Sequence, residues 1–320
     1  MNLFNRSLRI FLFVSAVIGG AIAACAWLFS RLILSPSISL VGHPADSESS
    51  IKTLPVHFPA NQDGLRVAGW FLPQQKGEQA PVMILIHGWS WNRIGEDRKD
   101  WIGRLIKAEK VDLLSLAYKF HQDGYAVLMY DMRNHGESAN TAGGVTFGMT
   151  EALDLLGAIN WLDCRSDVDM NRVGVTGFSM GANTAIFALS HTDQIKAVAA
   201  IQPTTPALFT HRMATYLAGP FGIPIVWLTN LFVKAFGGTA LEDVDMVAAA
   251  AHTGKTPVLY FQGANDPFGS VGDVQAMAAV TPNLVDIIIV AEADSRYSGY
   301  TYAINNPEIL LSYFSEYLNV

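Results

Sequence analysis

Charged residues are scarce in this sequence. Asp, Glu, Lys and Arg make up 15% of its 320 residues, whereas ordinary soluble domains carry about 25%. The hydrophobic content of 50% excludes intrinsic disorder, which requires low hydrophobicity and high net charge. Basic residues number 21 against 28 acidic ones, giving a net charge of −7. We therefore expect no nucleic-acid partner, because such a partner requires a basic face.

Cysteine is nearly absent as well. The two cysteines, Cys25 and Cys164, exclude a disulfide scaffold. No group of His and Cys residues has the spacing of metal ligands, so we expect no metal. No motif indicates a cofactor.

The apolar residues are concentrated near the N-terminus. Residues 10–29 contain no charged side chain, and a helix of that length rises about 30 Å, the thickness of a bilayer core. Two arginines precede this run and one follows it closely, which places the N-terminus in the cytoplasm and the remaining chain outside. We expect a single-pass anchor over residues 1–34, in contact with membrane lipid, and a stalk over residues 35–52.

Two alternatives to an uncleaved anchor stay open. Small residues such as Ala21, Ala23 and Ala24 suit the cleavage site of a signal peptide. The sequence Ile-Ala-Ala-Cys at residues 22–25 resembles the lipobox of a bacterial lipoprotein. The apolar stretch continues to Leu34, beyond either cut, which favours the anchor.

Short apolar runs recur through the rest of the chain. Runs that do not alternate with polar residues are typical of strands buried on both faces of a parallel sheet. They are residues 82–86, 126–130, 173–176, 197–201, 258–261 and 285–290. Two earlier runs, residues 53–58 and 65–72, predict an antiparallel hairpin around the turn Asn-Gln-Asp-Gly.

The remaining segments predict helices. Residues 97–118 predict one amphipathic helix. Residues 204–256 contain no strand pattern, and such a helical insertion either forms a lid over a site or adds helical packing. The pattern as a whole predicts an α/β domain over residues 53–320, with a mostly parallel sheet and helices on both faces.

One motif carries nucleophile chemistry. Gly177-Phe178-Ser179-Met180-Gly181 follows a predicted strand and precedes a predicted helix, which is the context of a nucleophile elbow. The sharp turn exposes the hydroxyl of Ser179 at a helix N-terminus, where amide groups stabilise negative charge. The amides of Met180 and Trp89 are the expected oxyanion hole.

Other polar motifs follow neighbouring strands. Asp266 follows the predicted strand over residues 258–261, where a serine hydrolase needs the acid that orients a histidine. We interpret His87, Asp131 and Arg133 as structural residues that hold the turns at this edge of the sheet.

Together these segments resemble the α/β-hydrolase superfamily, and most closely its serine aminopeptidase-like branch with membrane-anchored bacterial members. The resemblance runs from about residue 56 to 318 over the segments DGLRVAGWFLP, HGWSWNR, YDMRNHGES, GFSMG, GANDP and NNPEILLSYFSEYL. It implies that Ser179 is the nucleophile, Asp266 the acid, and Trp89 and Met180 the oxyanion donors. It also implies a small carboxylester or peptide-like acyl substrate.

The sequence departs from this family at the triad histidine. The family places that histidine just after the last strand, where this chain reads Ala-Glu-Ala-Asp-Ser-Arg-Tyr over residues 291–297. The expected slot falls on Ser295, or on Asp294 if the register shifts by one residue. The last histidine is His252, which precedes the acid, and His211 in the insertion is the alternative base.

Two functions follow from this departure. The first is a serine hydrolase with an incomplete triad, which the intact motif at Ser179 favours. The second is a hydrolase-fold binding protein at the membrane that no longer hydrolyses, which the missing histidine favours.

Overall fold

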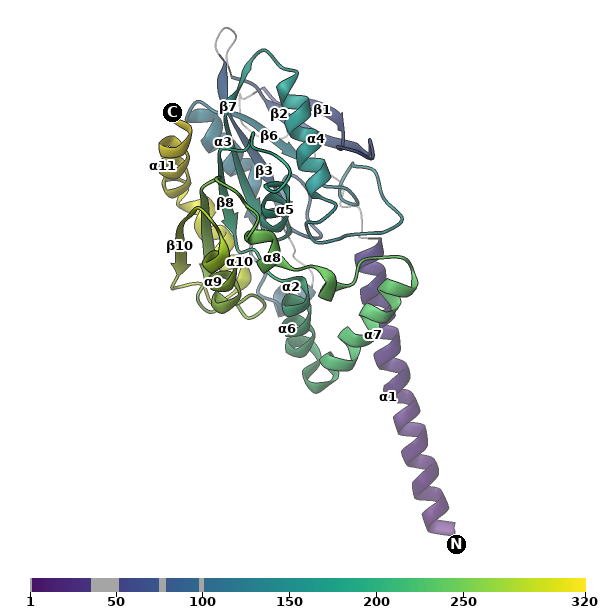
Figure 1. Ribbon diagram of the computed structural model, residues 1–320. Coiled ribbons are helices and arrows are strands. Elements are labelled where there is room, and N and C mark those ends of the chain that lie inside the picture. Colours follow the sequence, from purple (N-terminus) through teal and green to yellow (C-terminus); the bar gives the residue numbers. More distant parts are fainter. Residues whose placement is uncertain (1, 36–51, 75–78, 98–100) are drawn as a thin grey trace.

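The computed structural model describes residues 2–35, 52–74, 79–97 and 101–320. The predicted stalk falls almost entirely outside these residues. A sheet of eight strands forms the centre of the molecule, in the order β1-β2-β6-β3-β7-β8-β9-β10 (Figure 1). Its strands are β1 (Leu54–Pro59), β2 (Arg66–Leu72), β3 (Ala80–Ile86), β6 (Ala126–Tyr130), β7 (Val168–Phe178), β8 (Ala197–Ile201), β9 (Val258–Gly263) and β10 (Leu284–Val290).

The strand directions confirm the predicted mixed sheet. Strands β1 and β2 form the expected antiparallel hairpin, and β2 is also antiparallel to β6. All other pairs in the sheet are parallel. Every residue of β3, β6 and β8 is buried, which explains why these strands read as continuous apolar runs.

Helices cover both faces of the sheet and close two hydrophobic cores. One face packs against α4 (Ala152–Asp163), α5 (Met180–Ala188), α8 (Met246–Ala250) and α9 (Val271–Val280). The other packs against α3 (Leu113–Gln122), α10 (Arg296–Asn305) and α11 (Pro307–Leu318). The predicted α/β class is therefore confirmed.

The single helix predicted over residues 97–118 is wrong. The structure has a short helix α2 (Trp101–Leu105), a two-residue strand β5 (Val111–Asp112) and then α3. Strand β5 pairs with β4 (Gly95–Glu96), so Val111 is buried as a strand residue. The Asp112 side chain accepts a 2.9 Å hydrogen bond from the Ser115 amide, and this N-cap starts a new helix.

The insertion contains no strand, as expected. Its elements are α6 (Pro206–Ala218), the 3₁₀ turn η2 (Gly219–Phe221), α7 (Gly222–Ala235), the 3₁₀ turn η3 (Leu241–Asp243) and α8. Helices α6 and α7 form a V that projects from the sheet toward the N-terminal helix (Figure 1).

The N-terminal helix α1 (Asn2–Leu34) is apolar and long enough to cross a membrane. Its first half projects from the molecule (Figure 1), whereas Ala26, Ile33 and Leu34 near its end are buried. The Ile33 carbonyl accepts a 3.0 Å hydrogen bond from the Val145 amide. The last turns of α1 are therefore packed into the hydrolase-like body.

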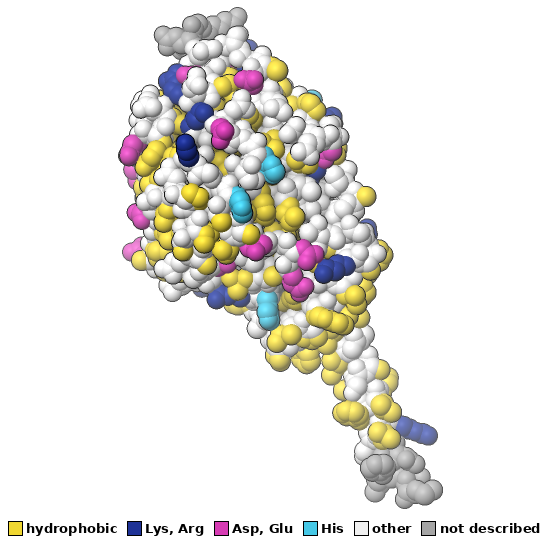
Figure 2. All heavy atoms as spheres, viewed as in Figure 1, with side chains coloured by type: hydrophobic (Ala, Val, Ile, Leu, Met, Phe, Trp, Pro, Cys, Tyr) yellow, Lys and Arg dark blue, Asp and Glu magenta, His cyan; other side chains and the backbone are white. Residues whose placement is uncertain are grey.

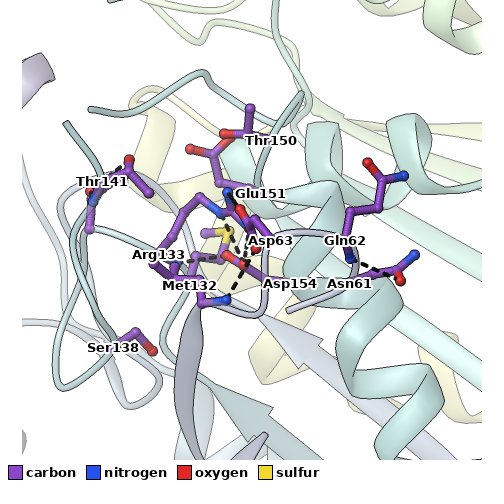
Figure 3. A network of polar contacts seen from close by, with 12 residues as sticks. Asn61, Gln62, Asp63, Met132, Arg133, Ser138, Thr141, Thr150, Glu151 and Asp154 are labelled. Carbon is purple, nitrogen blue, oxygen red and sulfur yellow. Dashed lines mark hydrogen bonds and ion pairs between the residues drawn. The ribbon is translucent and has the colours of Figure 1, made fainter. Parts of the chain in front are cut away.

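A buried ion-pair network fixes the loop after β6 (Figure 3). Arg133 donates to Asp154 of α4 at 2.8 and 2.9 Å and to Asp63 of the β1–β2 turn at 2.8 Å. Asp131 accepts hydrogen bonds from the amides of Arg93 and Glu137. The structural interpretation of Asp131 and Arg133 is confirmed.

Candidate active site

Ser179 lies at a strained corner between β7 and α5. Its φ of +54° falls in a region that non-glycine residues rarely adopt. A Cβ on Gly177 would lie 2.3 Å from the Gly181 carbonyl oxygen, and one on Gly181 would lie 2.4 Å from the Ile86 carbonyl oxygen. Both flanking positions therefore require glycine, which is the geometry that the G-x-S-x-G motif predicts.

A largely apolar cavity of about 580 Å³ lies over Ser179. The insertion forms one wall through α6, and the N-terminal helix contributes a second wall through Phe29 and Leu32. The α6 residues that line the cavity are Pro206, Phe209, Met213 and Leu217. Residues of the insertion and of the end of α1 therefore line the same cavity as Ser179.

Arg296 joins Ser179 to Asp266. Its Nη2 donates to the Ser179 Oγ at 3.2 Å and to the Gln202 carbonyl oxygen at 2.7 Å. Its Nη1 donates to the Asp266 Oδ2 at 2.7 Å. The guanidinium is buried and occupies the place between nucleophile and acid that a serine hydrolase gives to histidine.

Asp266 is held in place by further donors. Its Oδ1 accepts a 2.8 Å hydrogen bond from the Phe268 amide, and its Oδ2 accepts a longer one from Gln262 at 3.4 Å. The structure therefore brings Ser179 and Asp266 together, as the sequence predicts, with an arginine between them.

Trp89 and Met180 line the same cavity as Ser179. Met180 is the first residue of α5, so its amide has no partner within the helix. Neither amide donates a backbone hydrogen bond among the described residues. Both are available to an oxygen atom in the cavity.

The structure does not place Ser295 or Asp294 beside Ser179. The Ser295 hydroxyl caps α10 by accepting from the Ser298 amide at 3.0 Å, and it also donates to Glu109 at 3.2 Å. Asp294 is exposed and pairs with Lys107, and this hydrogen-bonded pair lowers the pKa of Asp294. The residue that reaches the nucleophile is Arg296, which follows Ser295.

Sequence reasoning missed Arg296 because it searched the loop for a group able to accept a proton. Arg296 is the first residue of α10 and directly follows Ser295, the expected slot. The guanidinium accepts no hydrogen bond. Burial tends to lower the pKa of Arg296, but its interactions with Tyr300 and Asp266 outweigh that effect and raise the pKa.

No described histidine lines the cavity. His211 and His252 are both exposed. His87 is buried, with Nδ1 bonded to the Gly88 carbonyl oxygen at 2.7 Å and Nε2 to the Met132 amide at 3.0 Å. Burial holds the pKa of His87 well below its ordinary value, so this side chain is a neutral structural group.

Tyr300 of α10 is a second residue that the sequence did not single out. It is buried and lines the cavity. Burial raises the pKa of the Tyr300 phenol, although Arg296 and a hydrogen bond with Ser179 oppose the shift. The phenol therefore stays protonated near neutral pH and is not a ready base.

Known proteins share this architecture. Residues 63–219 match the family model of the X-Pro dipeptidyl-peptidase (S15 family). An uncharacterized protein of Mycobacterium tuberculosis is 30% identical over 264 residues, which cover 82% of this chain and 78% of that protein.

Two solved structures agree with these matches. The esterase Pf2001 of Pyrococcus furiosus has a TM-score of 0.67 at 22% identity, covering 89% of this chain and 98% of the esterase. An acylaminoacyl peptidase of Pyrococcus horikoshii has a TM-score of 0.57 at 16% identity, covering 85% of this chain and 42% of the peptidase. The chain belongs to the α/β-hydrolase superfamily and to the same family as the Mycobacterium tuberculosis protein.

Proposed function

We propose that the protein is a membrane-anchored serine hydrolase that cleaves apolar acyl esters through Ser179. The observation that carries this proposal is the position of Ser179, at a strained corner on the floor of an apolar cavity. The amides of Trp89 and Met180 serve as the oxyanion hole, because both residues line the cavity and neither amide has a backbone partner among the described residues.

The reaction would proceed by acyl transfer. The Ser179 Oγ attacks the acyl carbon, the ester C–O bond breaks, and the alcohol leaves with a proton. Water then releases the acid and restores the serine. Arg296 donates to Oγ, so it stabilises negative charge there but takes no proton. The serine proton must pass to water, and the rate is correspondingly low.

The missing imidazole favours esters over amides. An amine leaves only when a general acid protonates it, which is the second task of a triad histidine. An alkoxide, and above all a phenoxide, is a better leaving group. We therefore place the substrate among carboxylesters rather than peptides.

Arg296 also favours a second candidate function, the binding of a long-chain carboxylate without turnover. The cavity is apolar and has a volume of about 580 Å³, which suits an apolar chain, and the guanidinium, the Ser179 hydroxyl and two amides offer donors to a carboxylate. The Nε of Arg296 is buried and has no hydrogen-bond partner among the described residues. A bound carboxylate would supply an acceptor for this donor.

The proposed anchor is α1, retained in the mature protein with the hydrolase body outside the cytoplasm. An intact N-terminus, found by mass spectrometry of membrane-extracted protein, supports retention. A mature N-terminus near Cys25 would instead identify residues 1–24 as a cleaved signal.

Labelling with a fluorophosphonate probe separates the two candidate functions. The hydrolase proposal predicts covalent labelling of the full-length chain and none of the Ser179→Ala variant. Absence of labelling, together with saturable binding of a fluorescent long-chain carboxylate that Arg296→Gln abolishes, would favour the binding protein. Equal labelling of both chains would show that Ser179 is not the nucleophile.

A further inference from the structure

We propose that α6, α7 and the end of α1 form one surface embedded in the membrane interface, so that the cavity draws an acyl-lipid substrate directly from the bilayer. This proposal rests on the proposed anchor and deepens the proposed esterase function. The partner of the exposed apolar face is a lipid surface.

The apolar face lies on α7. Ile223, Trp227 and Leu231 are 59%, 64% and 50% exposed, and their spacing of four residues places them on one side of the helix. Phe221 of η2 and Tyr216 of α6 are also 48% and 49% exposed. Figure 2 shows hydrophobic side chains gathered at the end of the body where α1 emerges. A contiguous apolar face of this kind marks an interaction site.

Contact with α1 sets the depth of α7. Residues 10–29 are uncharged and match the bilayer core in length. The Thr229 hydroxyl of α7 lies 3.3 Å from the carbonyl oxygen of Ala26, which is inside that segment. At about 1.5 Å per residue, Ala26 lies roughly 5 Å below the end of the apolar run. A bilayer that accommodates residues 10–29 therefore also receives the middle of α7.

The charges of α7 and of the end of α1 lie at one level. The only charged residue of α7 is Lys234, near its C-terminal end, and the neighbouring Gly238 approaches Leu34 at the end of α1. Arg31 of α1 is exposed at the same level. The deeper part of α7 contains no charge. The helical run over residues 206–235 is apolar and long enough to cross a membrane, but it is bent into the V of α6 and α7 (Figure 1). Helix α7 alone has 14 residues, too few to span the bilayer, so we place it in the interface, where such helices sit about 5–10 Å deep.

The cavity opens on this surface. Leu32 of α1, Leu217 of α6 and Leu105 of α2 line the cavity and are also 45%, 41% and 46% exposed. They therefore mark its mouth. Leu32 lies just beyond the uncharged run of α1, so the mouth lies at the membrane surface. An acyl chain can pass from the leaflet to Ser179 without crossing water, which favours a lipid ester over a water-soluble one.

Spin-label depth measurements test the embedded surface. The full-length chain, with Cys25→Ser and Cys164→Ser, is reconstituted in phosphatidylcholine vesicles and labelled with a nitroxide at Val14→Cys, Trp227→Cys or Glu316→Cys. Val14 lies in the proposed span, and the exposed Glu316 in α11 lies far from α1 and is the matched control (Figure 1). We expect the labels at 14 and 227 to be reached by oxygen and protected from a water-soluble nickel chelate, and the label at 316 to show the reverse.

The outcomes separate this inference from the proposals on which it rests. A buried label at 14 with a water-exposed label at 227 overturns the embedded surface and leaves the anchor standing. Exposure at both positions overturns the anchor and the embedded surface together. If the labels at 14 and 227 are both protected and fluorophosphonate does not label the chain, the embedded surface is supported and the esterase proposal is rejected.

A photoreactive phosphatidylcholine with a diazirine in its acyl chain tests access to the cavity. In the same vesicles, cross-links to Met213 and Leu217 are expected. Cross-links confined to the exposed half of α1 would contradict entry from the bilayer.

Discussion

The Nη2 of Arg296 donates a hydrogen bond of 3.2 Å to the Oγ of Ser179. The same guanidinium binds Asp266 at 2.7 Å, so an arginine connects two residues that a serine hydrolase connects through histidine. The fold is that of the α/β-hydrolases, and the proposed oxyanion donors Trp89 and Met180 line the same cavity as the serine. The side chain between them donates hydrogen bonds and accepts none.

Removing the charge of Asp266 is expected to destabilise the fold. Arg296 is buried, and a buried ion that loses its partner costs about 3–5 kcal/mol. Asp266→Asn should therefore lower the free energy of unfolding by about that amount, measured by denaturant titration of tryptophan fluorescence in detergent. Asp294→Asn is the control, because its pair with Lys107 is exposed, and it should leave the midpoint unchanged. Equal losses in both variants would contradict the role assigned to the Arg296–Asp266 pair.

The contribution of His87 to stability is expected to rise with pH as the pH approaches 6.5 from below. Burial holds the pKa of His87 well below 6.5 in the folded state, so the unfolded chain binds a proton there that the folded chain does not. Stability from this group is present above pH 6.5 and is lost as the pH falls. One such group contributes a slope of at most about 1.4 kcal/mol per pH unit. His87→Gln should reduce the slope measured by denaturant unfolding, whereas His252→Gln, at an exposed position, should not. An unchanged slope in His87→Gln would show that His87 also titrates normally in the folded chain.

The cavity predicts a preference for long acyl chains. Met213 lines it from α6, and a larger side chain at that position occupies space that the acyl group needs. Met213→Trp should lower kcat/KM for a decanoate ester by roughly tenfold, or about 1.4 kcal/mol, and change that for an acetate ester little. Hydrolysis of p-nitrophenyl esters measures both. Val280→Trp, at an exposed position of α9, is the control for an added tryptophan. Parallel losses for the two esters would mean that the acyl chain lies elsewhere.

Much of the fold follows from local pattern. The fully buried strands of the sheet read as apolar runs because both of their faces are covered by helices. The glycines around Ser179 predict the sharp turn, because a Cβ at either position would collide with the backbone there. The break within residues 97–118 was missed because the pairing of β5 with β4 depends on contacts between segments, which periodicity does not report.

The candidate site was predictable except at its centre. Ser179, Asp266, Trp89 and Met180 follow from motifs at the ends of strands. Arg296 does not, because a serine hydrolase requires a proton acceptor at this place, and arginine accepts no hydrogen bond. Its role emerges only from distances to Ser179 and Asp266.

The most direct measurement of the central claim is the pH–rate profile of the Arg296→His variant on an activated ester. If Arg296 stands where the triad histidine belongs, imidazole at this position should raise kcat/KM by roughly 10³-fold. The new activity should appear with an apparent pKa near 6.5, the ordinary value for histidine, and Ser179→Ala in the same chain should abolish it. An Arg296→His variant as slow as the parent, or a parent already fast with such a profile, would contradict this account of the site.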